Sequence, residues 1–388
     1  MVKRLAALFL LSLLLAGCNT APSTPDPGQA LTPTGSFSGE IKVGVTAPFT
    51  GDTADGGIQI RQGAELAAAE WNAQGGLLGR RNVIVAADDQ ANPSQAAPVA
   101  AKLLADQVVA VVGHKDSGLS IPASAIYGKA GIVMISPTSS NVQLTAQGLD
   151  TVFRVCPVDT TQGPVLADFV VNTLHKQRIA ILYADTAYGQ GLHDQYDQEL
   201  KKLGVTAVTE QQIHRGDVDF SATLQIVQPL TPDVVLYAGS VPEAIVIVQQ
   251  MKELGIKATF VGGDTLFQRE FTHTTGSASE GDYVTSFFPD PLKDDQTATW
   301  VARYRALFKR DPGGNSLGGY TAALAIFQAI KKANSADPAA IKDAMRNLQF
   351  DSFIGPIAFD AKGDLQNQRA HLYLWQVQNG AFVAVPNP

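Results

Sequence analysis

Short runs of β-branched residues alternate with longer helical patterns after Gly39, and this alternation restricts the possible folds more than any other feature of the chain. A strand, a helix and a second strand, repeated in this way, predict a parallel, doubly wound sheet. In the first set we expect strands at residues 41–45, 83–87, 108–112 and 132–135 and helices at 58–71, 95–104 and 121–129.

The same alternation begins again at residue 162. Two consecutive α/β sets predict an α/β fold of two doubly wound lobes with a cleft between them. The second set has expected strands at 179–183, 206–208, 234–237 and 259–261 and helices at 162–174, 191–203, 220–227 and 243–254. After Tyr283 the pattern is more helical, at 299–308, 320–332 and 338–348, and Asn379-Gly380 between apolar runs at 371–377 and 382–385 predicts a final hairpin.

The N-terminus has the pattern of an export signal. Lys3 and Arg4 precede a short leucine-rich run that ends in Leu15-Ala16-Gly17-Cys18. A basic start, a short apolar core and small residues at a cleavage site are typical of a secretory signal. The last four residues also resemble the bacterial lipoprotein signal, so we expect residues 1–18 to be the signal and Cys18 the lipidated anchor; the alternative is a plain signal peptide. Residues 19–38, rich in Pro, Thr, Ser and Gly, are expected to be a disordered tether.

Charge and cysteine content exclude several classes of protein. The formal charge is −7, and loss of Lys3 and Arg4 with the signal makes it −9, which disfavours nucleic acid as a partner. With Cys18 bound to lipid, Cys156 is the one cysteine left, so no disulfide framework is expected. No second apolar run is long enough to span a membrane.

Motifs of catalysis are not found in the sequence. The first strand is followed by Gly44-Val45-Thr46-Ala47-Pro48 instead of a dinucleotide-binding glycine motif, and neither a P-loop nor a G-x-S-x-G elbow occurs. The six histidines are scattered without metal-ligand spacing. We therefore expect a protein that is not an enzyme and that has no metal and no cofactor. His114, directly after a strand, is either a ligand contact or, more simply, a hydrogen-bonded structural histidine.

Small polar residues follow two strands of the first set. One strand leads to Ser117, where a helix begins, and the next leads to Thr138, Ser139 and Ser140. In open α/β sheets, ligands bind in the crevice at the carboxyl ends of the strands. Hydroxyl groups and backbone N–H groups at helix starts suit an anion such as a carboxylate. The alternative for each residue is a helix N-cap without a ligand.

The second set offers groups of the opposite kind. Tyr188 follows one strand, Ser240 another, and Asp264 comes after two glycines that bring the backbone close. Asp264 is a candidate partner for a ligand ammonium, although aspartate is also common in turns. Donors to a carboxylate on one lobe and a carboxylate acceptor on the other fit an α-amino acid.

In this order, several segments resemble the periplasmic binding proteins of ABC transporters for branched-chain amino acids. The likeness covers nearly the whole body of the chain. It implies a periplasmic binding protein type 1 fold with three crossovers, near Pro157, Ser286 and His371, and thus lobe 1 at 39–158 plus 286–370 and lobe 2 at 159–285 plus 371–388. The segments are IKVGVTAPFTG, QGAELAAAEWNAQGGLLGR, DDQANPSQAAPVAAKL, VVGHKDSG, SPTSSNVQLT, RIAILYADTAYGQG, DFSATL, PDVVLYAG and FIGPIAFDAKGDL.

The resemblance also implies roles for single residues. Ser117 and Ser140 match residues that bind the ligand α-carboxylate, Thr138 matches a backbone contact, and Tyr188 and Asp264 match residues that close over the ligand and hold its ammonium. Four positions differ from the Leu/Ile/Val-binding pattern: Gly56 replaces an aromatic residue, Ser240 replaces a tyrosine, and Ala91 and Asp116 stand where that pattern has a disulfide pair. The candidate wall of the side-chain pocket consists of Phe49, Gly56 and His114.

The expected function is that of an exported, lipid-anchored solute-binding protein. It captures a branched-chain or other neutral α-amino acid by hinge closure and delivers it to an ABC permease in the membrane. We expect it to act as a monomer that faces the periplasm or the cell exterior. The alternatives are a ligand sensor of the same fold and a binding protein for an amide, a urea-like compound or an aromatic acid.

Overall fold

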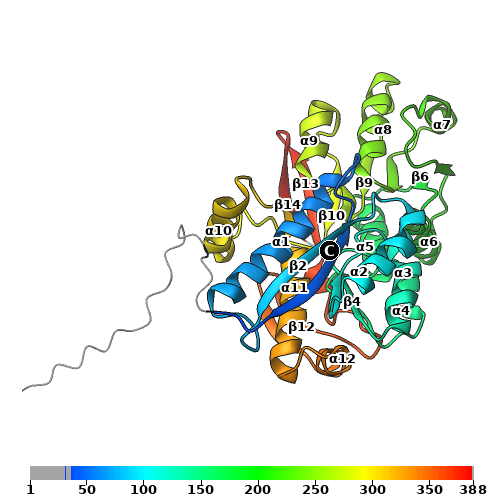
Figure 1. Cartoon of the computed structure of the whole chain (residues 1–388). Helices are drawn as coiled ribbons and strands as arrows, with labels where there is room; N and C mark the ends of the chain where they lie inside the picture. Colours follow the sequence, from blue (N-terminus) through cyan, green and yellow to red (C-terminus); the bar gives the residue numbers. More distant parts are fainter. Residues whose placement is uncertain (1–30, 32–35, 387–388) are drawn as a thin grey trace, which may run out of the picture.

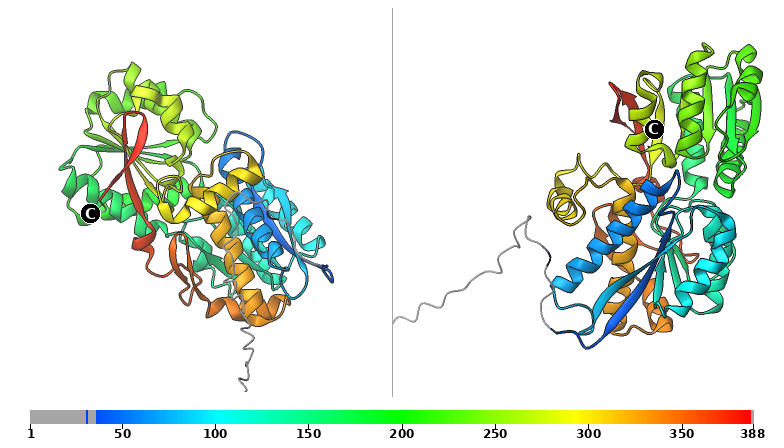
Figure 2. Two further views of the ribbon diagram at one scale, coloured as in Figure 1. Left: turned by 90° about the vertical axis from the view of Figure 1, so that its left-hand side faces the viewer. Right: turned by 45° about the horizontal axis from the view of Figure 1, so that its top comes forward.

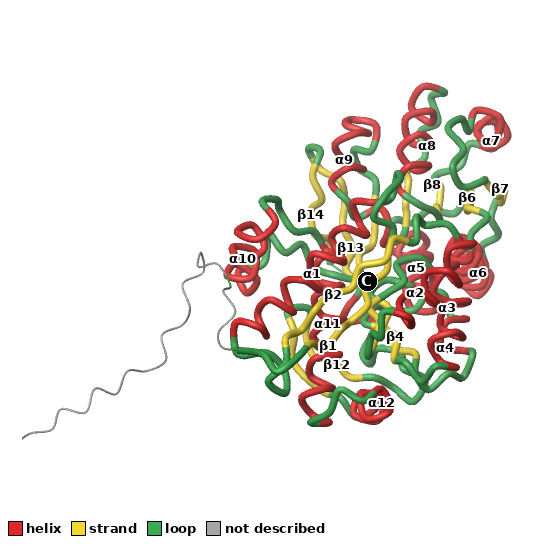
Figure 3. Tube along the Cα trace, in the orientation of Figure 1, coloured by secondary structure: helices red, strands yellow, loops and turns green. Residues whose placement is uncertain are grey.

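The computed structural model describes residue 31 and residues 36–386. The expected signal, the Cys18 anchor and most of the expected tether lie outside the described residues. Two lobes make up the body, and the views in Figure 1 and Figure 2 show them one above the other. Each lobe contains one large sheet, and helices lie on both faces of each sheet (Figure 3).

The first sheet has five strands in the order β2-β1-β3-β4-β5, and every neighbouring pair is parallel. Neighbouring residues along these strands point to opposite faces of the sheet and pack into different hydrophobic cores. Ile41, Val43 and Val45 pack on α1 (Ala54–Ala73) and α11 (Gly314–Ala333), whereas Val111 and Met134 pack on α2 (Ala96–Ala105) and α3 (Ser117–Lys129). This separation follows from the two-residue period of a strand. The strands are β1 (Glu40–Ala47), β2 (Arg81–Asp88), β3 (Ala110–Val112), β4 (Val133–Ser136) and β5 (Val152–Arg154).

The helices of the first lobe come from two distant parts of the chain. α1 and α11 pack with their backbones close together, because a Cβ added to Gly63 would lie 2.0 Å from the carbonyl oxygen of Ser316. Only glycine permits that approach. These helices are α1 (Ala54–Ala73), α2 (Ala96–Ala105), α3 (Ser117–Lys129), α4 (Gln143–Ala146), α10 (Ala298–Phe308), α11 (Gly314–Ala333) and α12 (Pro338–Arg346).

The second sheet has seven strands in the order β14-β13-β10-β9-β8-β6-β7. The pairs from β10 to β7 are parallel, and β13 runs antiparallel to both β10 and β14, where the predicted final hairpin joins the sheet. The strands are β6 (Ile179–Ala184), β7 (Thr209–Ile213), β8 (Val234–Ala238), β9 (Thr259–Gly262), β10 (Tyr283–Ser286), β13 (Tyr373–Gln378) and β14 (Ala381–Val385). The helices are α5 (Asp159–Asp168), α6 (Ala187–Lys202), α7 (Ser221–Val227), α8 (Val241–Glu253) and α9 (Arg269–Thr275).

The C-terminal hairpin confirms the turn predicted at Asn379-Gly380, where both residues have positive φ values of 53° and 72°. Other local predictions were wrong. The strand expected at 206–208 lies at β7, whose alternating polar residues cover an edge of the sheet. β5, β10 and the hairpin of β11 (Gln349–Ser352) and β12 (Gly355–Ala358) were not predicted. The residue-by-residue lobe boundaries stay a prediction.

Candidate ligand-binding site

A cavity of about 330 Å³ lies where the carboxyl ends of both sheets meet. Four helix N-termini border it, those of α3, α6, α8 and α11, and such N-termini carry partial positive charge. Five of the seven residues predicted to bind the ligand line it. The full lining is Pro93, Lys115, Asp116, Ser117, Gly118, Leu119, Thr138, Asp185, Thr186, Ala187, Tyr188, Arg215, Ser240, Asp264, Thr265, Gln268 and Asn315.

The first-lobe side of the cavity is the loop that leads from β3 into α3. Its first residue, Gly113, has a φ of 135°, and an added Cβ would lie 2.3 Å from the carbonyl oxygen of Thr46. Ser117 is the first residue of α3 and is buried, and the hydroxyl of Thr138 donates to the Lys115 carbonyl oxygen over 2.8 Å. Both side chains therefore stand at the positive end of a 13-residue helix.

Serine hydroxyl groups on the side away from the cavity hold this loop in place. The carbonyl oxygen of His114 accepts hydrogen bonds from Ser120 (3.1 Å), Ser136 (2.9 Å) and Ser139 (3.2 Å). Ser139 was predicted as a ligand contact, but its hydroxyl is committed to these backbone bonds and it does not line the cavity. Ser140 also lies outside the cavity lining and is fully buried. Its carbonyl oxygen accepts from the backbone N–H of Asp159.

An arginine that was not predicted holds the same segment. The guanidinium of Arg154, in β5, is fully buried and donates to the carbonyl oxygens of Ser139 (2.8 Å) and Asn141 (3.1 Å). Its Nε lies 2.7 Å from Oδ1 of Asp364, which balances its charge. Arg154 thus positions the loop that carries Thr138 without touching the cavity.

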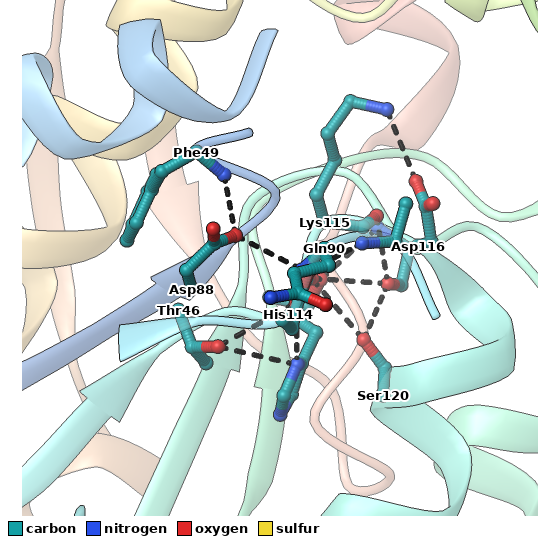
Figure 4. Close-up of polar contacts among 12 residues, drawn as sticks. Thr46, Phe49, Asp88, Gln90, His114, Lys115, Asp116 and Ser120 are labelled. Carbon is teal, nitrogen blue, oxygen red and sulfur yellow. Dashed lines mark hydrogen bonds and ion pairs between the residues drawn. The ribbon is translucent and has the colours of Figure 1, made fainter. Parts of the chain in front are cut away.

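The three residues proposed for the pocket wall do not line the cavity. Figure 4 shows His114 turned into the lobe, where its Nδ1 lies 2.7 Å from Oδ2 of Asp89, so it is the structural histidine of the two alternatives. Phe49 is placed by its backbone N–H, which donates to Asp88, and its ring packs under the guanidinium of Arg61. Gly56 lies behind the wall, against the side chains of two lining residues.

The second-lobe side presents an enclosed carboxylate. Asp264 follows β9, and its Oδ1 accepts hydrogen bonds from the Tyr188 hydroxyl (2.9 Å) and from Nε2 of Gln162 (3.1 Å). Gln162 also accepts from the Asp264 backbone N–H through its Oε1 (2.9 Å), so it fixes both halves of that residue. Ser240 lines the cavity as the N-cap residue of α8. Gln162 was not predicted, because no motif joins it to a residue so distant in sequence.

Burial is the main influence on the pKa values of the two acidic groups on the second-lobe side, Asp264 and Asp159. It raises the pKa of Asp264 to about 6, although the hydrogen bonds from Tyr188 and Gln162 and the charge of Lys115 act in the opposite direction. Burial also raises the pKa of Asp159 to about 7, and the nearby charge of Asp264 adds to that effect. An ammonium group placed beside Asp264 favours its charged form.

No cluster of three or more histidine, cysteine or acidic side chains suited to a metal ion occurs within residues 36–386 or at residue 31. In the same part of the chain, no helix has both the length and the apolar character that crossing a membrane requires. Cys156 is buried, and its thiol lies 3.7 Å from the carbonyl oxygen of Ser139.

The family of periplasmic binding proteins matches residues 40–381. The chain belongs to this family. Among its relatives, the Leu/Ile/Val-binding protein homolog 1 of Brucella suis is 37% identical over 344 residues, which are 88% of this chain and 92% of that protein. An amino acid binding protein of Pseudomonas aeruginosa is 36% identical over 350 residues, or 89% and 93% of the two chains. The structure of the branched-chain amino acid transporter substrate binding protein LivJ from Streptococcus pneumoniae, in complex with isoleucine, has a TM-score of 0.81 and 28% identity and covers 90% of this chain and all of that one.

The family and the fold confirm two expectations from the sequence. The chain has the architecture of a periplasmic binding protein type 1, and its relatives are named as solute-binding proteins of amino acid transport. Members of a periplasmic binding protein family act outside the cytoplasmic membrane. The roles of the single cavity residues stay predictions.

Proposed function

We propose that this protein is the substrate-binding component of an ABC importer and that it captures an α-amino acid between its two lobes. Support comes from the family, from relatives named for binding amino acids, and from the chemistry of the cavity. The protein binds and releases its ligand without transforming it. A permease in the membrane receives the amino acid.

The ligand α-carboxylate lies at the start of α3 in this proposal, where Ser117, Thr138 and the first N–H groups of the helix supply donors. The ligand ammonium lies against Asp264, with the Tyr188 hydroxyl beside it. The observation that carries the proposal is this carboxylate of Asp264, which lines the cavity and is oriented by Tyr188 and Gln162. A charge-assisted hydrogen bond in an enclosed site is stronger than one between neutral groups.

Closure of the lobes completes the site. Two contacts already join groups on opposite sides of the cavity: Nδ2 of Asn141 donates to the carbonyl oxygen of Ala187 over 2.5 Å, and Nη1 of Arg215 lies 3.2 Å from Oδ2 of Asp116. Such polar contacts can form and break as two rigid lobes rotate about a hinge. The ligand therefore enters an open form and stabilises the closed one.

The N-terminus sets the location in this proposal. Cys18 carries the lipid that holds the protein on the outer side of a membrane, and residues 19–38 form the tether. Tethering raises the local concentration of the loaded protein near its permease. The protein acts there as a monomer.

The test is a thermal-shift screen of the full chain in detergent against the common amino acids, with amides, urea and aromatic acids as rivals. A ligand that binds only the folded state raises the melting temperature. We expect an α-amino acid to do so. We also expect Asp264→Asn to weaken its binding about tenfold or more, since a hydrogen bond to a charged group contributes about 1.5–3 kcal/mol.

The matched control is Asp343→Asn, an exposed aspartate on α12. The affinity of the parent should fall below about pH 6, where Asp264 takes up a proton, and Asp264→Asn should lose that dependence. Stabilisation only by compounds without an ammonium group, or unchanged affinity in Asp264→Asn, would show that the proposal is wrong.

A further inference from the structure

Two cations and one carboxylate form a cluster in the wall of the cavity. Nζ of Lys115 lies 3.0 Å from Oδ1 of Asp116, and Nη1 of Arg215 lies 3.2 Å from Oδ2 of the same residue. Figure 4 shows the Lys115 side chain extending away from His114 to reach Asp116. The cluster was not predicted as part of the site, although Lys115 and Asp116 directly precede Ser117.

The cluster is enclosed and carries a net positive charge. The side chains of Lys115, Asp116 and Arg215 are 11%, 19% and 27% exposed. Burial acts to raise the pKa of Asp116, but the charges of Lys115 and Arg215 outweigh it and hold that pKa below its usual value. Asp116 is therefore an anion, and two cations share its single negative charge.

The hydrogen-bonding capacity of both cations exceeds what Asp116 accepts. An ammonium has three donors and a guanidinium five. Within the described residues, Asp116 is the one ion-pair partner of both Lys115 and Arg215. Asp264 also lines the cavity and is close enough for the charge of Lys115 to lower its pKa, against the effect of burial. A further lining carboxylate, Asp185, accepts from His214 Nδ1 (2.8 Å) and from the Arg215 backbone N–H (3.0 Å). It forms no ion pair with either cation.

Gly56 makes room for the lysine. A Cβ added to this residue would lie 3.0 Å from Cε of Lys115 and 2.9 Å from Nδ2 of Asn315. A larger residue at position 56 would therefore require the side chains of Lys115 and Asn315 to shift. The resemblance implies an aromatic residue at this part of the wall. In this chain the ammonium group of Lys115 and the side-chain amide of Asn315 line the cavity instead.

We propose that this end of the cavity binds an anionic side chain, which makes acidic α-amino acids such as glutamate or aspartate the ligand class and Lys115 and Arg215 the residues that select it. The inference rests on the proposed function, since Asp264 and the start of α3 hold the ammonium and the α-carboxylate. A second carboxylate supplies the acceptors that the two cations lack. A hydrocarbon side chain removes water from these cations and returns no acceptor.

Calorimetric titration of the full chain with glutamate, glutamine and leucine tests the proposal. Glutamate and glutamine have nearly the same shape, so the ratio of their affinities isolates the side-chain charge. We expect glutamate to bind about tenfold to a hundredfold more tightly than glutamine, in line with one or two hydrogen bonds to charged groups. Lys115→Met should lower that ratio, because it removes one of the two cations that select the side-chain charge, and Arg215 remains.

The matched control is Lys129→Met, an exposed lysine at the other end of α3. Arg215→Met removes the contact between the lobes as well, so it should weaken every ligand in addition to lowering the ratio. Tight binding of leucine, or equal binding of glutamate and glutamine, overturns the acidic ligand and leaves the proposed function intact. If glutarate, which lacks the ammonium, binds as tightly as glutamate, the proposed function fails and this inference fails with it.

Discussion

Arg154, the buried arginine behind the cavity, offers a quantitative test of how the loop that carries Thr138 is held. Replacing Arg154 by methionine keeps most of the side-chain volume and removes the guanidinium. The carboxylate of Asp364 then loses the charge that lies 2.7 Å away, and two carbonyl oxygens lose their donors. Removing one partner of a buried ion pair typically costs about 3–5 kcal/mol. We expect a loss of that size in the free energy of unfolding.

Urea unfolding followed by tryptophan fluorescence measures this loss. Trp300 reports on the core of the first lobe and Trp375 on that of the second. The matched control is Arg346→Met, because Arg346 is 39% exposed and its Nη2 lies 3.7 Å from Asp150. An exposed pair of this kind contributes at most about 1 kcal/mol. The urea midpoint of the control should therefore stay close to that of the parent.

A double variant separates the ion pair from simple packing. In Arg154→Met/Asp364→Asn the unpaired charge is removed as well, so the combined loss should be smaller than the two single losses added together. Additive losses, or a loss below about 1 kcal/mol for Arg154→Met alone, would refute the reasoning. Either result would mean that Asp364 finds water or a proton at little cost.

Two further predictions concern stability. Asp159 has a pKa raised to about 7 from 3.8, so the folded protein keeps a proton that the unfolded chain loses, and stability from this group falls as pH rises from about 4 to about 7. Asp159→Asn should therefore increase the free energy of unfolding at pH 8 by up to about 4 kcal/mol and raise the melting temperature there. At pH 4 the substitution should change neither quantity. Equal changes at both pH values would contradict this prediction. Gly63→Ala should lower the free energy of unfolding by about 2–3 kcal/mol, measured in urea, because its Cβ would lie 2.0 Å from the Ser316 carbonyl oxygen. An unchanged urea midpoint would count against that close approach.

The general plan of the fold follows from local patterns. Alternating strands and helices indicate the two lobes, because burial on both faces makes the central parallel strands apolar. The position of the site follows from the rule that carboxyl ends of parallel strands share an edge. Five predicted contacts line the cavity for this reason, namely Ser117, Thr138, Tyr188, Ser240 and Asp264.

The remaining features depend on contacts between distant residues. Ser139 looks like Thr138 in the sequence, yet it faces inward and binds the His114 carbonyl oxygen. Arg154 lies in a strand of three residues, and its partner Asp364 comes from the opposite end of the chain. Local periodicity carries no information on such pairs. A buried charge inside an apolar strand is the one signal that could have indicated Arg154, since it requires a partner.

The polar wall of the cavity shows why resemblance to a family does not identify the ligand of one member. Ser117 and Asp264, which we propose to hold the backbone of the amino acid, both line the cavity, and every α-amino acid presents the same zwitterion to them. The wall that meets the side chain is free to change. The glycine at position 56 leaves space for the side-chain stem of Lys115. The substitution that removes an aromatic wall therefore also makes room for the lysine. Gly56→Phe should accordingly displace Lys115 and lower the preference for glutamate over glutamine, even though residue 56 itself does not line the cavity.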